Sequence, residues 1–248
     1  MLVDTHCHLD QYSIEELVLE IDINNIYITM GTSSENWFQI LELHSIYPHI
    51  IPALGLHPWY VSEDYEFQFK LLTELISKYQ VSVMGEIGLD FSSKYSNTAT
   101  LQLNALTLQL ELASQNELPI SLHVIKAHNP LISLLKQFSV TGVIHGLGSS
   151  VEMTKQYLDL GFKIGVNGVV VRENARRYHH LVQTFGVDAL VLETDSPNIL
   201  LPNKSRSLLV DIYQVVIKIA ELTGLPETEI IRATNHNAQR IFNLKERL

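Results

Sequence analysis

The sequence predicts an α/β fold, a (β/α)8 TIM barrel built as a single domain. Short runs rich in β-branched residues alternate with longer stretches of helical apolar spacing along all 248 residues, and this alternation is typical of parallel βα units. No Pro/Gly/Ser-rich linker or change in composition divides the chain. We therefore expect residues 1–248 to form one domain.

Eight short apolar runs are the predicted strands, and the segments between them carry apolar residues near helical spacing. The predicted strands are residues 2–8, 26–30, 51–57, 81–86, 120–123, 142–145, 163–166 and 190–195. The predicted helices are residues 14–23, 35–45, 66–79, 101–116, 131–138, 151–160, 174–185 and 208–222. One helix after each strand is the repeat of a closed barrel.

The last segment, residues 226–244, is predicted to close the barrel. A helix start is expected at Pro226-Glu227, since proline suits the first turn of a helix. Asn235-His236-Asn237 is expected to break the segment, so that Ile241 and Phe242 pack against the barrel wall in a second helix.

The composition favours a protein without a membrane segment. Hydrophobic residues make up 46% of the chain, enough for a large core, yet no uncharged apolar stretch approaches the ~20 residues that span a bilayer. No basic region precedes an apolar stretch at the N-terminus, and the single cysteine cannot form an internal disulfide. We expect a cytoplasmic location and no obligate protein partner.

The formal net charge of −10 argues against binding of nucleic acid through a broad basic surface. The densest basic group is Arg172, Arg176 and Arg177, followed by Lys204 and Arg206, and both are expected to be solvated surface. A phosphate substrate would therefore depend on metal ions for its attraction to the site.

His6 and His8 form a candidate metal-binding pair at the end of the first predicted strand. Side chains alternate across a strand, so the two imidazoles point to one face while Cys7 points into the core. Zinc, manganese, iron and nickel accept such a pair. Taken alone, the pattern is equally compatible with a metal-binding pair and with two histidines that only form ordinary hydrogen bonds.

The carboxyl ends of barrel strands meet on one rim, where catalytic residues gather. Six of the eight predicted strands end in histidine or a carboxylate, which supply His6, His8, His57, Glu86, His123, His145 and Asp195. Glu86 is the natural bridge between two cations, because it lies in the middle of the strand order between Gly85 and Gly88. His6, His8 and Asp195 come from the first and eighth strands, which are neighbours, and would complete one metal site. His123 and His145 would complete the other.

Four motifs resemble the TatD family of metal-dependent hydrolases, and the resemblance covers nearly the whole chain. They are Asp4-Thr5-His6-Cys7-His8-Leu9-Asp10, Gly55-Leu56-His57-Pro58, Gly85-Glu86-Ile87-Gly88-Leu89-Asp90 and Glu193-Thr194-Asp195-Ser196-Pro197. The resemblance implies a two-metal centre in a TIM barrel. It assigns His6, His8, Glu86 and Asp195 to one metal and Glu86, His123 and His145 to the other.

The resemblance also implies a divalent-metal-dependent deoxyribonuclease that cleaves phosphodiester bonds with a metal-activated water. DNA or another phosphate ester is the expected substrate, and the cofactors are two divalent ions, with zinc or magnesium favoured over manganese or iron. Besides Glu86, the expected catalytic residues are Asp195 as general base and His57, which would hold the substrate phosphate or the attacking water. The alternative for His57 is a hydrogen-bonded residue of the rim.

Three departures from the family pattern keep other substrates open. Ile125 and Asn129 stand where relatives carry arginine and aspartate, the sixth-strand block reads His-Gly-Leu-Gly-Ser at residues 145–149, and the loop at residues 198–206 lacks the usual closing triplet. Isoleucine cannot grip phosphate as arginine does. The alternatives are therefore a two-metal hydrolase of a non-nucleic-acid ester, lactone or amide, and a metal-binding barrel without activity. Trp59 and Tyr60 are expected either to stack on a base or to serve in loop packing.

Overall fold

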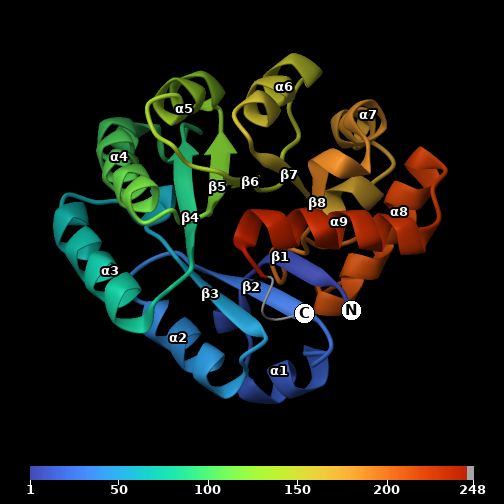
Figure 1. The fold of residues 1–248 in the computed structure, drawn as a ribbon, viewed down its shortest axis with the longest axis horizontal. Coiled ribbons are helices and arrows are strands. Elements are labelled where there is room, and N and C mark those ends of the chain that lie inside the picture. Colours follow the sequence, from blue (N-terminus) through green and yellow to red (C-terminus); the bar gives the residue numbers. More distant parts are fainter. Residues whose placement is uncertain (245–248) are drawn as a thin grey trace.

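A computed structural model of the chain, which describes residues 1–244, contains one sheet of eight parallel strands in the order β1 to β8 (Figure 1). The strands are β1 Val3–Cys7, β2 Ile26–Gly31, β3 Ile50–Leu54, β4 Val83–Asp90, β5 Ile120–Ile125, β6 Gly142–Ile144, β7 Lys163–Val166 and β8 Leu190–Leu192. This order, with helices between the strands, is the predicted (β/α)8 barrel in a single domain. The last four residues of the predicted domain, 245–248, lie outside the described part.

The helices surround the strands, as the view in Figure 1 shows. They are α1 Ile14–Glu20, α2 Trp37–Ile46, α3 Tyr65–Tyr79, α4 Ala99–Gln115, α5 His128–Leu135, α6 Val151–Asp159, α7 Arg176–Phe185, α8 Ile212–Thr223 and α9 Glu227–Phe242. Most of them bury an apolar stripe against the sheet, as α8 does with Val215, Val216 and Ile219. Among residues 1–244, no helix combines the length and apolar character needed to cross a membrane.

Strands β4 and β5 run further than the sequence predicts. The sequence places Glu86 at the end of the fourth strand, but β4 continues to Asp90 because Ile87 to Asp90 pair with Leu122 to Ile125 of β5. The pairing depends on Gly88, since a Cβ there would lie 2.0 Å from the carbonyl oxygen of His123. Glu86 and His123 are therefore held on paired strands, which fixes their separation.

Strands β1 and β8 meet at a seam held by hydrogen bonds between side chains and loop backbone. The backbone N–H and the hydroxyl of Thr194 donate to the two oxygens of Asp4 at 3.0 and 2.6 Å. Just beyond them, the N–H of Asp195 donates to the carbonyl of His6 at 2.8 Å. The seam thus ends directly at two of the predicted metal ligands.

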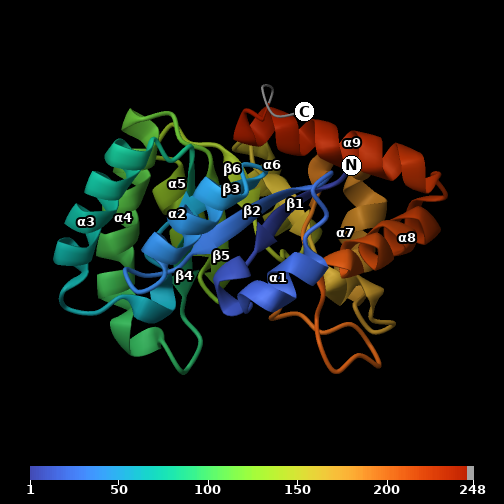
Figure 2. The ribbon, with the colours of Figure 1, turned by 90° about the horizontal axis from the view of Figure 1, so that it is seen from below.

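Helix α9 lies beside the chain's N-terminus (Figure 2) and closes the barrel. Its Ala238 and Phe242 join the core cluster formed by the interior residues of the strands. The expected break at Asn235-His236-Asn237 is wrong, because α9 is continuous from Glu227 to Phe242. Asparagine competes with helix backbone only where its side chain bonds locally. Here Asn235 accepts from the N–H of Val3, and Asn237 donates to the carbonyl of Leu190.

Candidate metal centre

Glu86 lies at the centre of a buried cluster of histidines at the carboxyl end of the barrel. Its Oε2 is 3.4 Å from His6 Nε2 and 3.7 Å from His8 Nε2. Its Oε1 is 3.4 Å from His57 Nε2 and 3.1 Å from His123 Nδ1. Each carboxylate oxygen therefore faces its own pair of imidazoles, which is the arrangement that a carboxylate shared by two cations requires.

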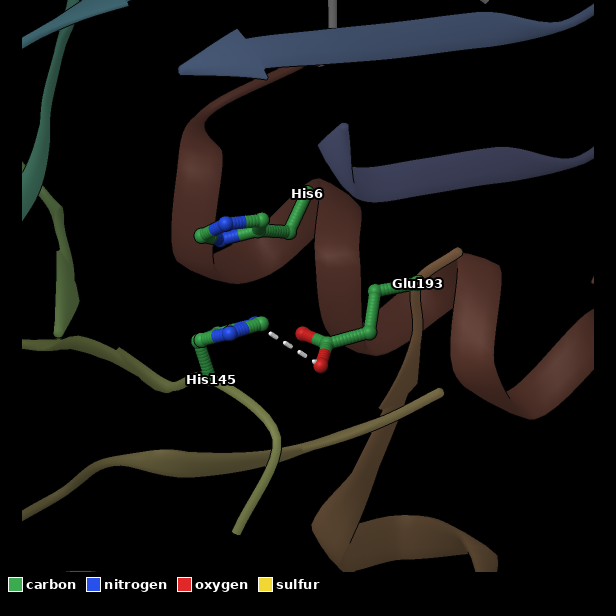
Figure 3. A group of neighbouring side chains, drawn as sticks. All are labelled: His6, His145 and Glu193. Atoms are coloured by element: carbon green, nitrogen blue, oxygen red, sulfur yellow. Dashed lines mark ion pairs between the residues drawn. The ribbon is translucent and has the colours of Figure 1, made fainter. Parts of the chain in front are cut away.

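Asp195 and His145 form the other side of the cluster. Asp195 Oδ1 lies 3.3 Å from His8 Nε2, and Oδ2 lies 3.6 Å from His145 Nε2. The rings of His145 and His6 are stacked with centroids 3.7 Å apart, and Nδ1 of His145 lies 3.0 Å from Oε1 of Glu193 (Figure 3). All six predicted metal ligands and His57 therefore lie in one buried cluster.

Local structure sets the direction of each side chain. His6 lies within β1 and His8 follows it, so both point into the barrel while Cys7 packs in a core cluster with Leu9 and Tyr27, as predicted. Ser121 Oγ of β5 lies 3.0 Å from His6 Nδ1, which leaves Nε2 of that ring directed toward Glu86.

The side chains form three groups whose ligand atoms lie within 4.8 Å of one another: His6 with His8 and Glu86, His57 with Glu86 and His123, and His6 with His145 and Glu193. The first two groups share Glu86, as the sequence predicts for a bridging residue. His145 groups with His6 and Glu193, whereas the sequence places it beside His123. The assignment of individual ligands to each metal stays a prediction.

Several buried polar atoms of the cluster lack a hydrogen-bond partner among the described residues, and this fits metal binding. They are His6 Nε2, His8 Nδ1, His123 Nε2 and Glu193 Oε2. A buried polar atom without a partner costs about 1–3 kcal/mol. A divalent cation accepts imidazole nitrogen and carboxylate oxygen as ligands, so the donor set matches such an ion.

The charges of the cluster also fit the binding of cations. Burial alone would raise the pKa of Asp195, but the charges of His145 and His8 outweigh it and bring the pKa to about 2. Burial would lower the pKa of His145, but Glu193 and Asp195 raise it to about 10. The negative charges of Glu193 and Asp195 are thus stabilised by nearby positive charge, which either protonated histidines or bound cations can supply.

His57 differs from His145 in charge. Burial lowers its pKa to about 4, and the attraction of Glu86 only partly offsets that effect. The imidazole is therefore neutral near pH 7. Its Nδ1 accepts the N–H of Trp59 at 3.2 Å, which leaves the proton on Nε2, the atom that faces Glu86.

Glu193 and Asp90, to which the sequence assigned no role, contact two histidines of the cluster. Glu193 is fully buried and accepts from the N–H of Gly146 at 2.7 Å, beside its contact with His145. Asp90 Oδ2 lies 3.5 Å from His123 Nε2. The available signal was the position of both residues in the motifs Gly85-Glu86-Ile87-Gly88-Leu89-Asp90 and Glu193-Thr194-Asp195-Ser196-Pro197.

A cavity of about 510 Å³ opens above the cluster. Its lining includes His8, His57, Glu86, His123, His145 and Asp195, together with Asp10, Glu35, Trp59, Tyr60 and other polar residues. None of the described residues that line it is lysine or arginine. The cations of the 198–206 loop are engaged elsewhere, because Lys204 pairs with Asp211 and Arg206 pairs with Glu16.

Proteins of known family are similar to this chain over its whole length. The family model described as TatD related DNase matches residues 3–243. The uncharacterized metal-dependent hydrolase YjjV of Escherichia coli is 30% identical over 98% of this chain and 98% of that protein. The crystal structure of YjjV has a TM-score of 0.90 at 28% identity and covers 98% of both chains. The 3'-5' ssDNA/RNA exonuclease TatD of Erwinia tasmaniensis is 29% identical over 98% of this chain and 97% of that protein.

Proposed function

Because the chain belongs to the family of TatD-related DNases, a group of metal-dependent hydrolases, we propose that it hydrolyses phosphodiester bonds of nucleic acid. The observation that carries the proposal is Glu86, whose two oxygens each face a pair of buried histidines. A relative of 29% identity named as a DNA and RNA exonuclease supports nucleic acid as the substrate.

We propose that His6, His8, Glu86, His123, His145 and Asp195 hold two divalent cations, with zinc or magnesium favoured. Cations bound there would activate a water molecule and neutralise charge on the phosphoryl oxygens. The cavity's lack of lysine and arginine among the described residues leaves this task to the cations. A cytoplasmic location stays a prediction from the sequence.

Two residues have proposed roles in moving or donating protons. Asp195 is ionised near neutral pH and lies at the cavity wall, so it can accept the proton of the attacking water. His57 is neutral, lines the cavity and carries its proton on Nε2 beside Glu86, so it can donate a hydrogen bond to a phosphate oxygen bound there without adding charge. Asp195 would serve both as ligand and as base.

The test is hydrolysis by the protein loaded with zinc, magnesium or manganese, before and after Glu86→Ala. Loss of the shared carboxylate should lower turnover of a single-stranded oligonucleotide at least ~100-fold, since metal-centre electrostatics contribute several kcal/mol. Glu74→Ala, which removes an exposed carboxylate from α3, serves as the control and should leave the rate unchanged. Equal turnover by Glu86→Ala and the parent protein would overturn the proposed centre.

A second candidate is hydrolysis of a non-nucleic-acid ester, lactone or amide, because none of the described residues that line the cavity is an arginine or lysine that could bind phosphate. Ile125 stands at the position of the expected arginine, is 38% exposed, and does not line the cavity. A metal centre polarises a carbonyl as readily as a phosphoryl group. A panel of carboxylic esters, lactones and amides beside the oligonucleotide separates the two candidates, because turnover of esters without cleavage of any phosphodiester would replace the first by the second.

A further inference from the structure

Two aromatic side chains form one wall of the cavity and remain open to solvent. Trp59 is 45% exposed and Tyr60 is 47% exposed, and both lie in the short 3-10 turn Pro58–Tyr60 that follows His57. We call Trp59 and Tyr60 the aromatic wall. Aromatic surface kept in water gains nothing for folding, so a wall of this kind suits a ligand with a flat ring.

The orientation of Trp59 is fixed by its neighbours. Its Nε1–H donates to Oδ2 of the buried Asp90 at 2.7 Å. Its ring is stacked on that of Tyr95, with centroids 5.1 Å apart and an angle of 12° between the planes. The ring also lies 4.9 Å from His57 and 5.8 Å from His123, measured between centroids. The Trp59 ring is thus held in place beside His57 and His123, the residues proposed to lie near the scissile bond.

Lys94 brings positive charge to this side of the cavity. Its Nζ lies 4.8 Å from the centroid of the Tyr95 ring and 5.8 Å from that of Trp59. Lys94 is exposed and has no carboxylate within ion-pair distance among the described residues. It is therefore free to pair with an incoming anion beside the aromatic rings.

Other parts of the lining are unsuited to a phosphate chain. Asp10 and Glu35 contribute carboxylates there, and Asn36 donates to Asp10 at 2.9 Å. A polyanion would be repelled by these acids and attracted by Lys94. The distribution of charge therefore favours a path in which the nucleic-acid strand runs from the metal centre along the aromatic wall.

We propose that the aromatic wall binds an unpaired nucleobase next to the scissile phosphodiester, and that Lys94 pairs with an adjoining phosphate. This deepens the proposed function and rests on it. Such a subsite accepts a base only from a single strand or an unwound strand end, because a base inside a duplex is stacked on its neighbours. This requirement agrees with the relative named as an ssDNA/RNA exonuclease.

Binding to the metal-loaded protein tests the proposal apart from turnover. The probes are fluorescein-labelled oligothymidylate, a fully abasic oligonucleotide of the same length and a blunt duplex, with affinity read by anisotropy before turnover in a stopped-flow instrument. Trp59 also reports contact directly, because the chain has two tryptophans and Trp37 is 0% exposed. Oligothymidylate should quench the fluorescence of Trp59, and the abasic strand should not.

Trp59→Ala should weaken binding of oligothymidylate about 5- to 150-fold, the range for loss of one stacked base, and should leave binding of the abasic strand unchanged. Trp59→Phe keeps a ring but loses the bond to Asp90, so it should retain most of the affinity. Loss of affinity in Trp59→Phe equal to that in Trp59→Ala would overturn stacking and assign the effect to Asp90.

A matched pair at the end of α3, outside the cavity lining, provides the control. Lys78 lies 5.0 Å from the centroid of the Tyr79 ring, and Tyr79 is 45% exposed at the end of α3. Lys94→Ala should weaken the binding of oligothymidylate and reduce the salt dependence of that binding. Lys78→Ala and Tyr79→Ala should change neither the affinity nor its salt dependence.

Failure of this proposal differs from failure of the proposed function. Equal binding and equal cleavage of base-bearing and abasic strands would overturn the base subsite and leave the phosphodiesterase in place. Absence of phosphodiester cleavage from every probe, with esters cleaved instead, would overturn the proposed function and this inference with it.

Discussion

At the scale of single residues, Glu193 fixes the histidine that follows β6. The carboxylate is 0% exposed and touches both His145 and the N–H of Gly146. A Cβ at Gly165 would lie 2.1 Å from Oε2 of Glu193, so the glycine leaves the space that this side chain fills. Replacing a residue that orients a metal-binding histidine typically lowers metal affinity about 10- to 100-fold.

Glu193→Gln should lower the affinity for the divalent cation about 10- to 100-fold. Glutamine has the same size and still accepts from Gly146, but it removes the negative charge that faces His145. Competition with a chromophoric chelator measures the change, and Glu74→Gln on the exposed face of α3 is the control. Unchanged affinity in Glu193→Gln would contradict the orienting role.

The sequence predicted those site residues that carry a local pattern. His6 and His8 follow from alternation along a strand, and Glu86 follows from its glycine-flanked motif. Asp90 and Tyr95 were not singled out, because their roles arise from Trp59, which comes from another loop. Contacts between distant segments have no periodic signature in one sequence.

At the scale of elements, the pairing of β4 with β5 sets the distance between Glu86 and His123. The pairing extends through Gly88, whose φ of +146° and close approach to His123 exclude a side chain. The predicted fourth strand stops at residue 86, whereas β4 ends at Asp90. Only the neighbouring strand reveals that Ile87 to Asp90 continue the sheet.

Gly88→Ala should destabilise the protein by at least ~3 kcal/mol, because the new methyl group meets backbone rather than a movable side chain. Gly224→Ala is the matched control, since Gly224 has a φ of +73° and a Cβ there would have no neighbouring atom within 4 Å. Gly224→Ala should lower the free energy of unfolding by only roughly 1–2 kcal/mol, the cost of a left-handed backbone conformation for alanine. Urea unfolding compares the two, and equal losses would refute the clash.

At the scale of the whole molecule, α9 completes the barrel by inserting Phe242 and Ala238 into the core of strand residues. The alternation of strands and helices predicted the barrel and its closing segment, since this pattern repeats along the whole chain. It did not predict an unbroken α9. Asn235 and Asn237 were expected to break the helix, but their side chains form hydrogen bonds with Val3 and Leu190. Each partner is more than 40 residues away in the sequence.

Phe242→Ala should lower the free energy of unfolding by about 3–5 kcal/mol, the cost of emptying a buried aromatic site. Phe242 is 1% exposed, whereas Phe67 on α3 is 74% exposed. Phe67→Ala is therefore the control and should stay within about 0.5 kcal/mol of the parent. Denaturant midpoints at equal slope provide the measurement, and similar values for both variants would show that α9 contributes little to the core.

The seam between β1 and β8 has a consequence for the order in which the chain acquires its site. Asp4 and Thr194 bond across 190 positions of sequence, so nearly the whole chain must be synthesised before His8 can contact Asp195. Loop closure of this length adds only a logarithmic entropy cost, but contacts so distant in sequence form slowly. A cation held across the seam would then stabilise the barrel where its two ends join, and its capture would mark the completion of folding.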